Sequence, residues 1–161
     1  MTPTKIFTLG YSGWKPEAIT ELAQRMNALV VDCRLVPQSR YAPWNGVAFA
    51  RRMGMHYLYV RAFGNVNYKM PLEHARLANF EQGALQVERC VANTGRPIIL
   101  MCGCKDVQEC HRRLVAKSLA NRWGATITHI PTPPKKPSQG SSQGPSRPKP
   151  NPTPSLFPDE D

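Results

Sequence analysis

The chain has 161 residues and a formal net charge of +10 at pH 7. No apolar run reaches the roughly 18–20 residues that span a bilayer, and no signal-peptide pattern opens the sequence. Five unevenly spaced cysteines do not resemble a secreted disulfide framework, so we expect a cytoplasmic protein with reduced thiols and no membrane partner.

Composition divides the chain into two parts. Residues 131–161 contain ten of the 16 prolines, together with Ser, Gly, Gln and Lys and very few apolar residues. Such a segment cannot bury enough apolar surface to offset its conformational entropy, which predicts a disordered tail. Residues 1–130 then form a single α/β domain that carries most of the positive charge, and this charge favours polyanionic partners.

Strands and helices alternate along the predicted domain. The apolar and β-branched runs at 6–9, 28–31, 56–60, 98–101 and 125–130 predict strands. Between them, helical spacing predicts helices that begin at Pro16 and that cover 47–53, 73–93 and 107–123. This alternation favours a three-layer, Rossmann-like fold, with a mainly parallel sheet of about five strands and helices on both faces.

The turn after the first strand contains Tyr11 and Ser12 between two glycines. Glycines permit close backbone approach, and the amino terminus of the following helix offers N–H groups to an anion. The turn matches neither the dinucleotide-binding fingerprint nor the phosphate-binding loop, so we expect a substrate contact without a cofactor.

Asp32 and Arg34 directly follow the second expected strand. Ligands bind outside the carboxyl ends of strands in open α/β sheets, so we expect both residues at a site. The Asp32 carboxylate can act as a general base on water or stabilise a positively charged sugar, and Arg34 can hold a phosphate. The alternative is a structural Asp–Arg pair that braces the loop.

A loop rich in cations and aromatic rings follows, with Ser39, Arg40, Tyr41 and Trp44. Aromatic rings stack on bases while arginines follow the phosphate backbone. Tyr11, Trp14 and Tyr68 extend the same surface. The alternative is that the aromatic rings pack inward and fix the loop.

The strand at 98–101 leads into the densest group of reactive side chains, namely Cys102, Cys104, Lys105, Asp106, Cys110, His111 and Arg112. The thiols and the imidazole offer zinc ligands, but Cys110 and His111 on one helix would point about 100° apart, which disfavours a shared ion. Alternatively, Cys110 near a helix amino terminus is a reactive thiolate. We favour a third interpretation, in which Cys102 and Cys110 only pack in the core and the polar side chains act, so we expect no metal.

Five segments together resemble the bacterial family catalogued as domain of unknown function 488. They are Thr8-Leu-Gly-Tyr-Ser12, Val31-Asp-Cys-Arg34, Pro37-Gln-Ser-Arg40, Gly54-Met-His-Tyr57 and Cys102…Cys110-His-Arg112. The resemblance covers residues 5–130 and implies a compact α/β domain, but it supplies no settled reaction. Cys104 departs from the pattern expected of the family.

One carboxylate, many cations and several aromatic rings favour a DNA glycosylase that hydrolyses the N-glycosidic bond of a modified or damaged base, in repair or in defence against phage. Asp32 would stabilise the sugar cation and orient water, while His111 or Lys105 assists the departing base. DNA would be held by Tyr11, Ser12, Trp14, Arg34, Ser39, Arg40, Tyr41, Trp44, Cys102, Asp106, Cys110 and Arg112. The alternatives are a thiol-dependent or small-molecule hydrolase using Cys110 or Cys102, and a non-catalytic nucleic-acid-binding module.

Overall fold

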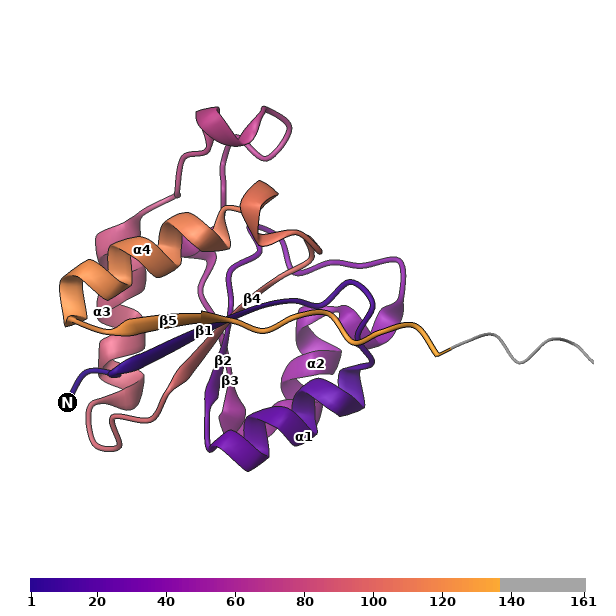
Figure 1. Ribbon diagram of the computed structural model, residues 1–161, viewed down its shortest axis with the longest axis horizontal. Helices are drawn as coiled ribbons and strands as arrows, with labels where there is room; N and C mark the ends of the chain where they lie inside the picture. The colour runs from indigo at the N-terminus through magenta and orange to yellow at the C-terminus, as the bar shows by residue number, and fades with distance from the viewer. Residues whose placement is uncertain (137–161) are drawn as a thin grey trace, which may run out of the picture.

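A computed structural model describes residues 1–136 of the chain, and residues 137–161, on which most of the predicted disordered tail falls, lie outside this description. The fold is a three-layer α/β fold around a five-stranded sheet, as predicted (Figure 1). Every strand is parallel to its neighbours, and the order across the sheet is β3-β2-β4-β1-β5. The strands are β1 (Lys5–Gly10), β2 (Leu29–Asp32), β3 (Tyr57–Tyr59), β4 (Ile98–Cys102) and β5 (Thr126–His129).

The centre of the sheet consists of the strands with the longest buried runs. All four residues of β2 and all five of β4 are buried, as expected for parallel strands covered on both faces. β4 lies between β1 and β2, so Ile98 pairs with Ile6 on one side and with Leu29 on the other. The carboxyl ends of β1, β4 and β2 are therefore neighbours.

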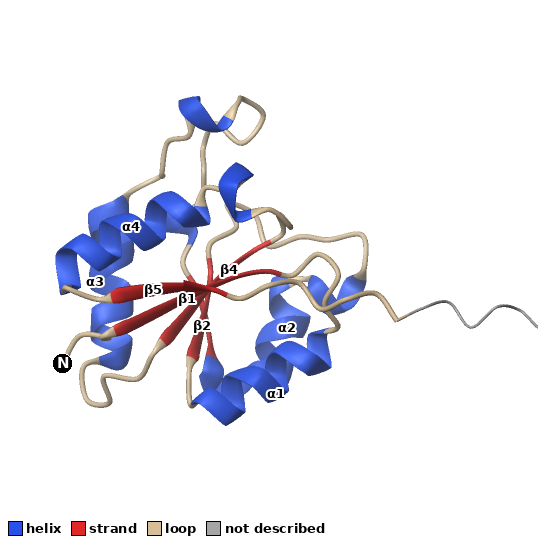
Figure 2. Ribbon diagram, viewed as in Figure 1, coloured by secondary structure: helices blue, strands red, loops and turns tan. Residues whose placement is uncertain are grey.

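Two helices cover each face of the sheet (Figure 2). The helices α1 (Pro16–Met26) and α2 (Gly46–Met53) lie on one face, where Ile19, Phe49 and Met101 belong to one buried cluster. The helices α3 (Phe80–Val91) and α4 (Arg112–Trp123) lie on the other face, where Val87, Leu100 and Leu119 belong to a second cluster.

The predicted helix over 73–93 was too long at its start. A 3₁₀ turn at Leu72–His74 is followed by extended chain, in which Leu77 forms an isolated antiparallel bridge with Asn65. The helix begins only at Phe80, because the Oδ1 atom of Asn79 accepts a hydrogen bond from the Gln82 N–H and caps the first turn.

The predicted helix over 107–123 is interrupted. A 3₁₀ turn covers Val107–Glu109, Cys110 is extended with φ −119° and ψ 135°, and α4 begins at Arg112. Cys110 and His111 therefore precede the helix, and the helical angle assumed between their side chains does not apply.

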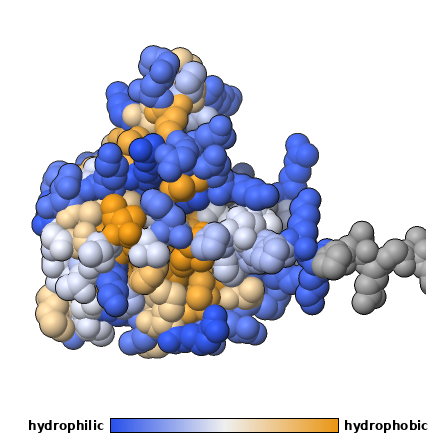
Figure 3. All heavy atoms as spheres, in the orientation of Figure 1, coloured by the Kyte–Doolittle hydropathy of each residue, from blue (hydrophilic) through white to orange (hydrophobic). Residues whose placement is uncertain are grey.

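Hydrophilic side chains cover most of the face shown in Figure 3, and apolar side chains reach it in limited areas. Within residues 1–136, no helix is both long enough and apolar enough to cross a bilayer.

Candidate functional site

The loops that follow β1, β2 and β4 meet at one edge of the sheet. The Tyr11 N–H donates to the Cys102 carbonyl at 2.9 Å, and the Cys33 N–H donates to the Met101 carbonyl at 2.9 Å. The structure thus brings together the first turn, the Asp32–Arg34 segment and the segment that begins at Cys102.

A pocket of about 460 Å³ opens at this edge, and we call it the Arg34 pocket. It is lined by Arg34, Leu35, Val36, Gln38, Asn65, Tyr68, Cys102, Cys104 and His111. The lining contains a guanidinium group, amides, an aromatic ring, thiols and an imidazole, but no carboxylate.

Asp32 does not reach the pocket. Its side chain is fully buried, and its carboxylate receives Arg34 Nε at 2.9 and 3.1 Å and Arg34 Nη2 at 2.6 Å. The Tyr57 hydroxyl donates a further bond at 2.7 Å. With its oxygens occupied and no access to water through the pocket, Asp32 is not positioned as a general base, and the geometry supports the alternative of a structural Asp–Arg pair.

The contacts with Asp32 also shift the pKa values of Arg34 and Tyr57. Burial lowers the pKa of Arg34, but the hydrogen bonds and charge of Asp32 outweigh this effect, so the pKa is raised above its usual range. Burial and the charge of Asp32 raise the pKa of Tyr57. Arg34 is therefore a fixed cation, held also by the Trp44 carbonyl at 2.7 Å from Nη1.

Cys102, Cys104, Cys110 and His111 form a group at the floor of the Arg34 pocket that we call the thiol–imidazole cluster. The Cys102 Sγ atom lies 3.9 Å from His111 Nδ1, and His111 Nε2 lies 2.8 Å from the Cys33 carbonyl oxygen. Because a carbonyl only accepts, Nε2 carries a proton, and Nδ1 is the ring nitrogen directed toward the Cys102 sulfur.

The thiols of this cluster are not equivalent. Hydrogen bonds with Cys102 and Cys104, together with burial, raise the pKa of Cys110, which disfavours the alternative of a reactive thiolate at this position. The hydrogen bond with Cys104 also raises the pKa of Cys102. Hydrogen bonds with Cys102 and Cys110 lower the pKa of Cys104.

Arg112 holds the loop that follows β4. Its side chain is 2% exposed, and its Nη1 and Nη2 atoms donate to the carbonyls of Cys104 at 2.7 Å and of Lys105 at 3.3 Å. A Cβ atom on Gly10 would lie 1.8 Å from the Cys104 carbonyl oxygen, so only glycine fits at the end of β1. Arg112 is buried against the backbone and is not placed as the expected phosphate ligand.

Two of the expected base-stacking residues stack on each other. The Tyr11 and Trp44 rings are 4.5 Å apart at 21°, and Trp44 is buried against Phe49. Trp14 is half-buried and packs against the same cluster. These rings fix the loop, as in the alternative given for them, and Tyr68 is the aromatic residue that lines the pocket.

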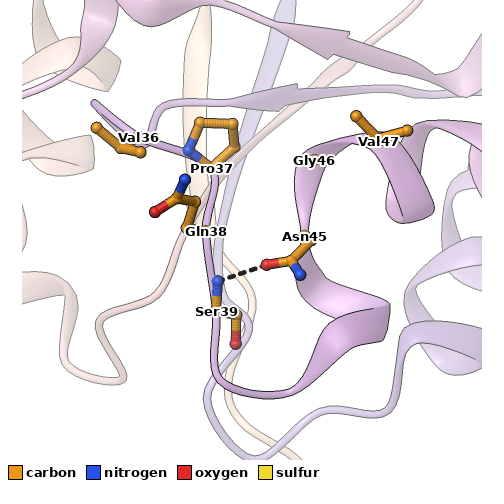
Figure 4. A pocket seen from close by; sticks show the side chains of 7 residues that line it. All are labelled: Val36, Pro37, Gln38, Ser39, Asn45, Gly46 and Val47. Carbon is orange, nitrogen blue, oxygen red and sulfur yellow. Dashed lines mark hydrogen bonds between the residues drawn. The ribbon is translucent and has the colours of Figure 1, made fainter.

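The remaining expected residues lie outside the Arg34 pocket. Ser12, Arg40 and Tyr41 are exposed, and Asp106 accepts a hydrogen bond from the Gln108 N–H. Ser39 lines an adjacent hollow that shares Val36 and Gln38 with the Arg34 pocket. There its N–H donates to Asn45 Oδ1 at 2.6 Å (Figure 4). That hollow has no ionisable side chain in its lining and is not our candidate site.

Lys105 lies in a neighbouring groove of about 750 Å³ that we call the lysine groove. Besides Lys105, it is lined by Lys15, Lys135 and Lys136. Lys105 directly follows Cys104, so the groove and the Arg34 pocket share the loop after β4.

Sequence reasoning assigned no role to Asn65 and placed Cys104 outside the set of site residues. Asn65 is distant in sequence from the other residues that line the Arg34 pocket, apart from Tyr68. Its Oδ1 atom accepts hydrogen bonds from the N–H groups of Asn67 and Arg76 at 3.0 Å each. Its Nδ2 atom is the group left for a ligand. The Gly64-Asn65-Val66-Asn67 run was the available signal, since such residues favour a structured turn.

Three side chains of the cluster converge closely enough to share a metal ion. The ligand atoms of Cys102, Cys110 and His111 all lie within 4.8 Å of one another. This convergence is possible because Cys110 adopts an extended conformation before α4.

The fold and this site together define an α/β protein whose functional groups lie at the carboxyl ends of parallel strands. The chain belongs to the family described as Domain of unknown function DUF488, whose model matches residues 16–119. No curated protein and no solved structure gives a significant match.

Proposed function

We propose that this protein is a hydrolase that acts on nucleic acid, and that its reaction centre is the thiol–imidazole cluster rather than Asp32. The observation that carries the proposal is the Arg34 pocket, in which a fixed cation faces two thiols and an oriented imidazole. Pockets of this kind at the switch points of open parallel sheets bind ligands in many enzymes.

The pocket suits one nucleotide of a larger substrate. Arg34 offers donors to a phosphate or to a base edge, Asn65 Nδ2 offers a further donor, and the Tyr68 ring offers a stacking surface. The lysine groove continues from the same loop and favours the neighbouring phosphates of a strand. The net charge of +10 supports the same class of substrate.

The bond that we propose for cleavage is the N-glycosidic bond of a modified or damaged base in DNA. Water adds a hydroxyl group to the sugar carbon, the bonding electrons leave with the base, and the base takes up the remaining proton. Asp32 positions Arg34 in this scheme and does not activate water, because its carboxylate is enclosed by Arg34 and Tyr57.

The test is a gel assay on plain and modified duplex DNA, with alkali added to cleave the strand at abasic sites. We expect alkali-sensitive strands with the wild-type chain and strongly reduced cleavage with Cys102→Ser. Asn65→Asp keeps the Oδ1 acceptor but replaces the Nδ2 donor with a negative oxygen, so we expect kcat/KM to fall about tenfold or more.

Val47→Ala is the matched control, because Val47 is exposed and does not line the Arg34 pocket (Figure 4). Its activity should equal that of the wild type. DNA binding without cleavage on every substrate would instead indicate the non-catalytic module, and full activity of Cys102→Ser would exclude the cluster as the reaction centre.

A further inference from the structure

We propose that Cys102, Cys110 and His111 bind a zinc ion at the floor of the Arg34 pocket. The site deepens the proposed function, because it supplies an activator of water that Asp32 is not placed to provide. Binding of the ion itself does not depend on the identity of the substrate.

The proposed ligand atoms of Cys102, Cys110 and His111 lie close together without a bound ion. The three atoms lie within 4.8 Å of one another, and the Cys102 Sγ to His111 Nδ1 distance is 3.9 Å. Tetrahedral zinc with ordinary Zn–S and Zn–N bonds places sulfur and nitrogen about 3.6 Å apart. The Cys102–His111 pair is therefore within a few tenths of an ångström of the separation that zinc requires.

His111 has the orientation of a metal ligand. The proton on Nε2 points to the Cys33 carbonyl oxygen at 2.8 Å, so the Nδ1 lone pair faces Cys102. A ligating histidine usually donates its other ring N–H to a carboxylate, carbonyl or water, which fixes the tautomer. Cys33 follows β2 whereas His111 precedes α4, so this bond also joins separate segments of the fold.

The charge around the cluster is also consistent with bound thiolates. Arg112 is 2% exposed, and among residues 1–136 no carboxylate pairs with its guanidinium group. A buried cation requires a nearby anion. Arg112 donates to the Cys104 carbonyl, so its guanidinium group lies beside the loop that carries Cys102 and Cys104.

The fourth position of the ion faces the pocket. Cys102, Cys104 and His111 line that pocket, whereas Cys110 is fully buried behind them. Three protein ligands with an open fourth position are typical of catalytic zinc, which lowers the pKa of a bound water. A zinc ion held by Cys102, Cys110 and His111 would supply a Lewis acid to a water at that position.

The experiment measures metal binding without reference to activity. The full-length chain is loaded with zinc under reducing conditions, freed of excess metal and analysed for its zinc content. We expect close to a single zinc ion per chain. Exchange for Co²⁺ should give the intense visible bands of tetrahedral cobalt and a near-ultraviolet thiolate-to-cobalt band.

Two variants of the proposed ligands and two variants of other cysteines test the assignment. Cys110→Ser and His111→Ala should lose most of the bound zinc and the tetrahedral cobalt bands. Cys104→Ser should retain zinc and the tetrahedral cobalt bands, because the Cys104 sulfur is not among the three converging ligand atoms. Cys90→Ser is the matched control, since Cys90 is exposed on α3 and outside the cluster, and it should be indistinguishable from the wild type.

Several results overturn the site. A wild-type chain that takes up neither zinc nor tetrahedral cobalt excludes it without any variant, and so does a Cys102–Cys110 disulfide in chain prepared with zinc. Equal zinc loss in Cys90→Ser and Cys110→Ser also excludes it. Zinc binding without cleavage of any DNA overturns the proposed function but leaves the metal site intact, so the two failures are distinguishable.

Discussion

At the scale of single residues, the contacts of Asp32 decide its role. Both oxygens accept from Arg34, and one also accepts from Tyr57. An acid that functions as a base needs a free lone pair directed at a substrate or a water. Asp32 instead determines where the guanidinium group of the pocket lies.

The pair can be tested by its effect on stability. Asp32→Asn leaves the buried guanidinium group without a counter-charge, so we expect the free energy of unfolding to fall by about 3–5 kcal/mol in urea titrations. The double variant Asp32→Asn/Arg34→Met should lose less than the sum of the single variants, because it removes the unpaired charge. An Asp32→Asn chain of unchanged stability that has lost all cleavage would restore Asp32 as a catalytic residue.

The sequence placed Asp32, Arg34 and Cys102 at strand ends because apolar runs stop abruptly before them. The residues that contact these side chains could not be predicted from the sequence. Tyr57 lies on the next strand along the chain, and His111 approaches Cys33 across 78 positions. Such contacts follow from the order of strands in the sheet, which local periodicity does not encode.

At the scale of elements, the alternation of strands and helices was sufficient to predict the layers. Parallel neighbours require crossovers, and each crossover here contains a helix. The errors fall where polar groups override the helical spacing. Asn79 caps α3 later than apolar spacing suggested, and the extended Cys110 separates a 3₁₀ turn from α4.

A side-chain network joins α3 to α4 on their shared face of the sheet. Arg122 donates to Glu88 at 2.6 Å and to Glu81 at 2.8 Å, and Trp123 Nε1 donates to Glu88 at 2.7 Å. The hydrogen bonds of Arg122 and Trp123 outweigh the effect of burial and lower the pKa of Glu88. The stabilisation is therefore present above the usual pKa of a glutamate and is lost as the pH falls through the lowered value.

Glu88→Gln tests this network, since it keeps the acceptor for Trp123 but removes the charge. We expect a lower melting temperature than wild type at neutral pH, with a smaller effect than Asp32→Asn. The difference between the two chains should disappear in acid, where the wild-type Glu88 is protonated. A difference that is independent of pH would show that the charge of Glu88 contributes nothing.

At the scale of the whole molecule, the positive charge and the lining of the lysine groove both support the proposed nucleic-acid substrate. Lys15 and Lys105 line the lysine groove, beside the loop that also borders the Arg34 pocket. Lysines that contact phosphates release counterions from the nucleic acid when they bind. The affinity for DNA should therefore fall steeply as the salt concentration rises.

Lys15→Ala and Lys105→Ala should each reduce the slope of log K against log salt concentration by about one. Lys117→Ala is the matched control, because Lys117 is exposed on α4 and does not line the groove. Fluorescence anisotropy with a labelled oligonucleotide at several salt concentrations measures the slopes. An equal change in the Lys117→Ala chain would assign the effect to net charge rather than to the groove.

The position of β4 in the sheet has a consequence for folding during synthesis. β1 and β2 do not pair with each other, and β4 enters between them only after three strands and three helices have been synthesised. When only residues 1–90 have emerged from the ribosome, β4 is not yet available to pair with β1 and β2. The edges of β1 and β2 that β4 later joins therefore have unpaired backbone groups. Such intermediates fold slowly and aggregate readily, which makes nascent chains of this length natural clients for chaperones.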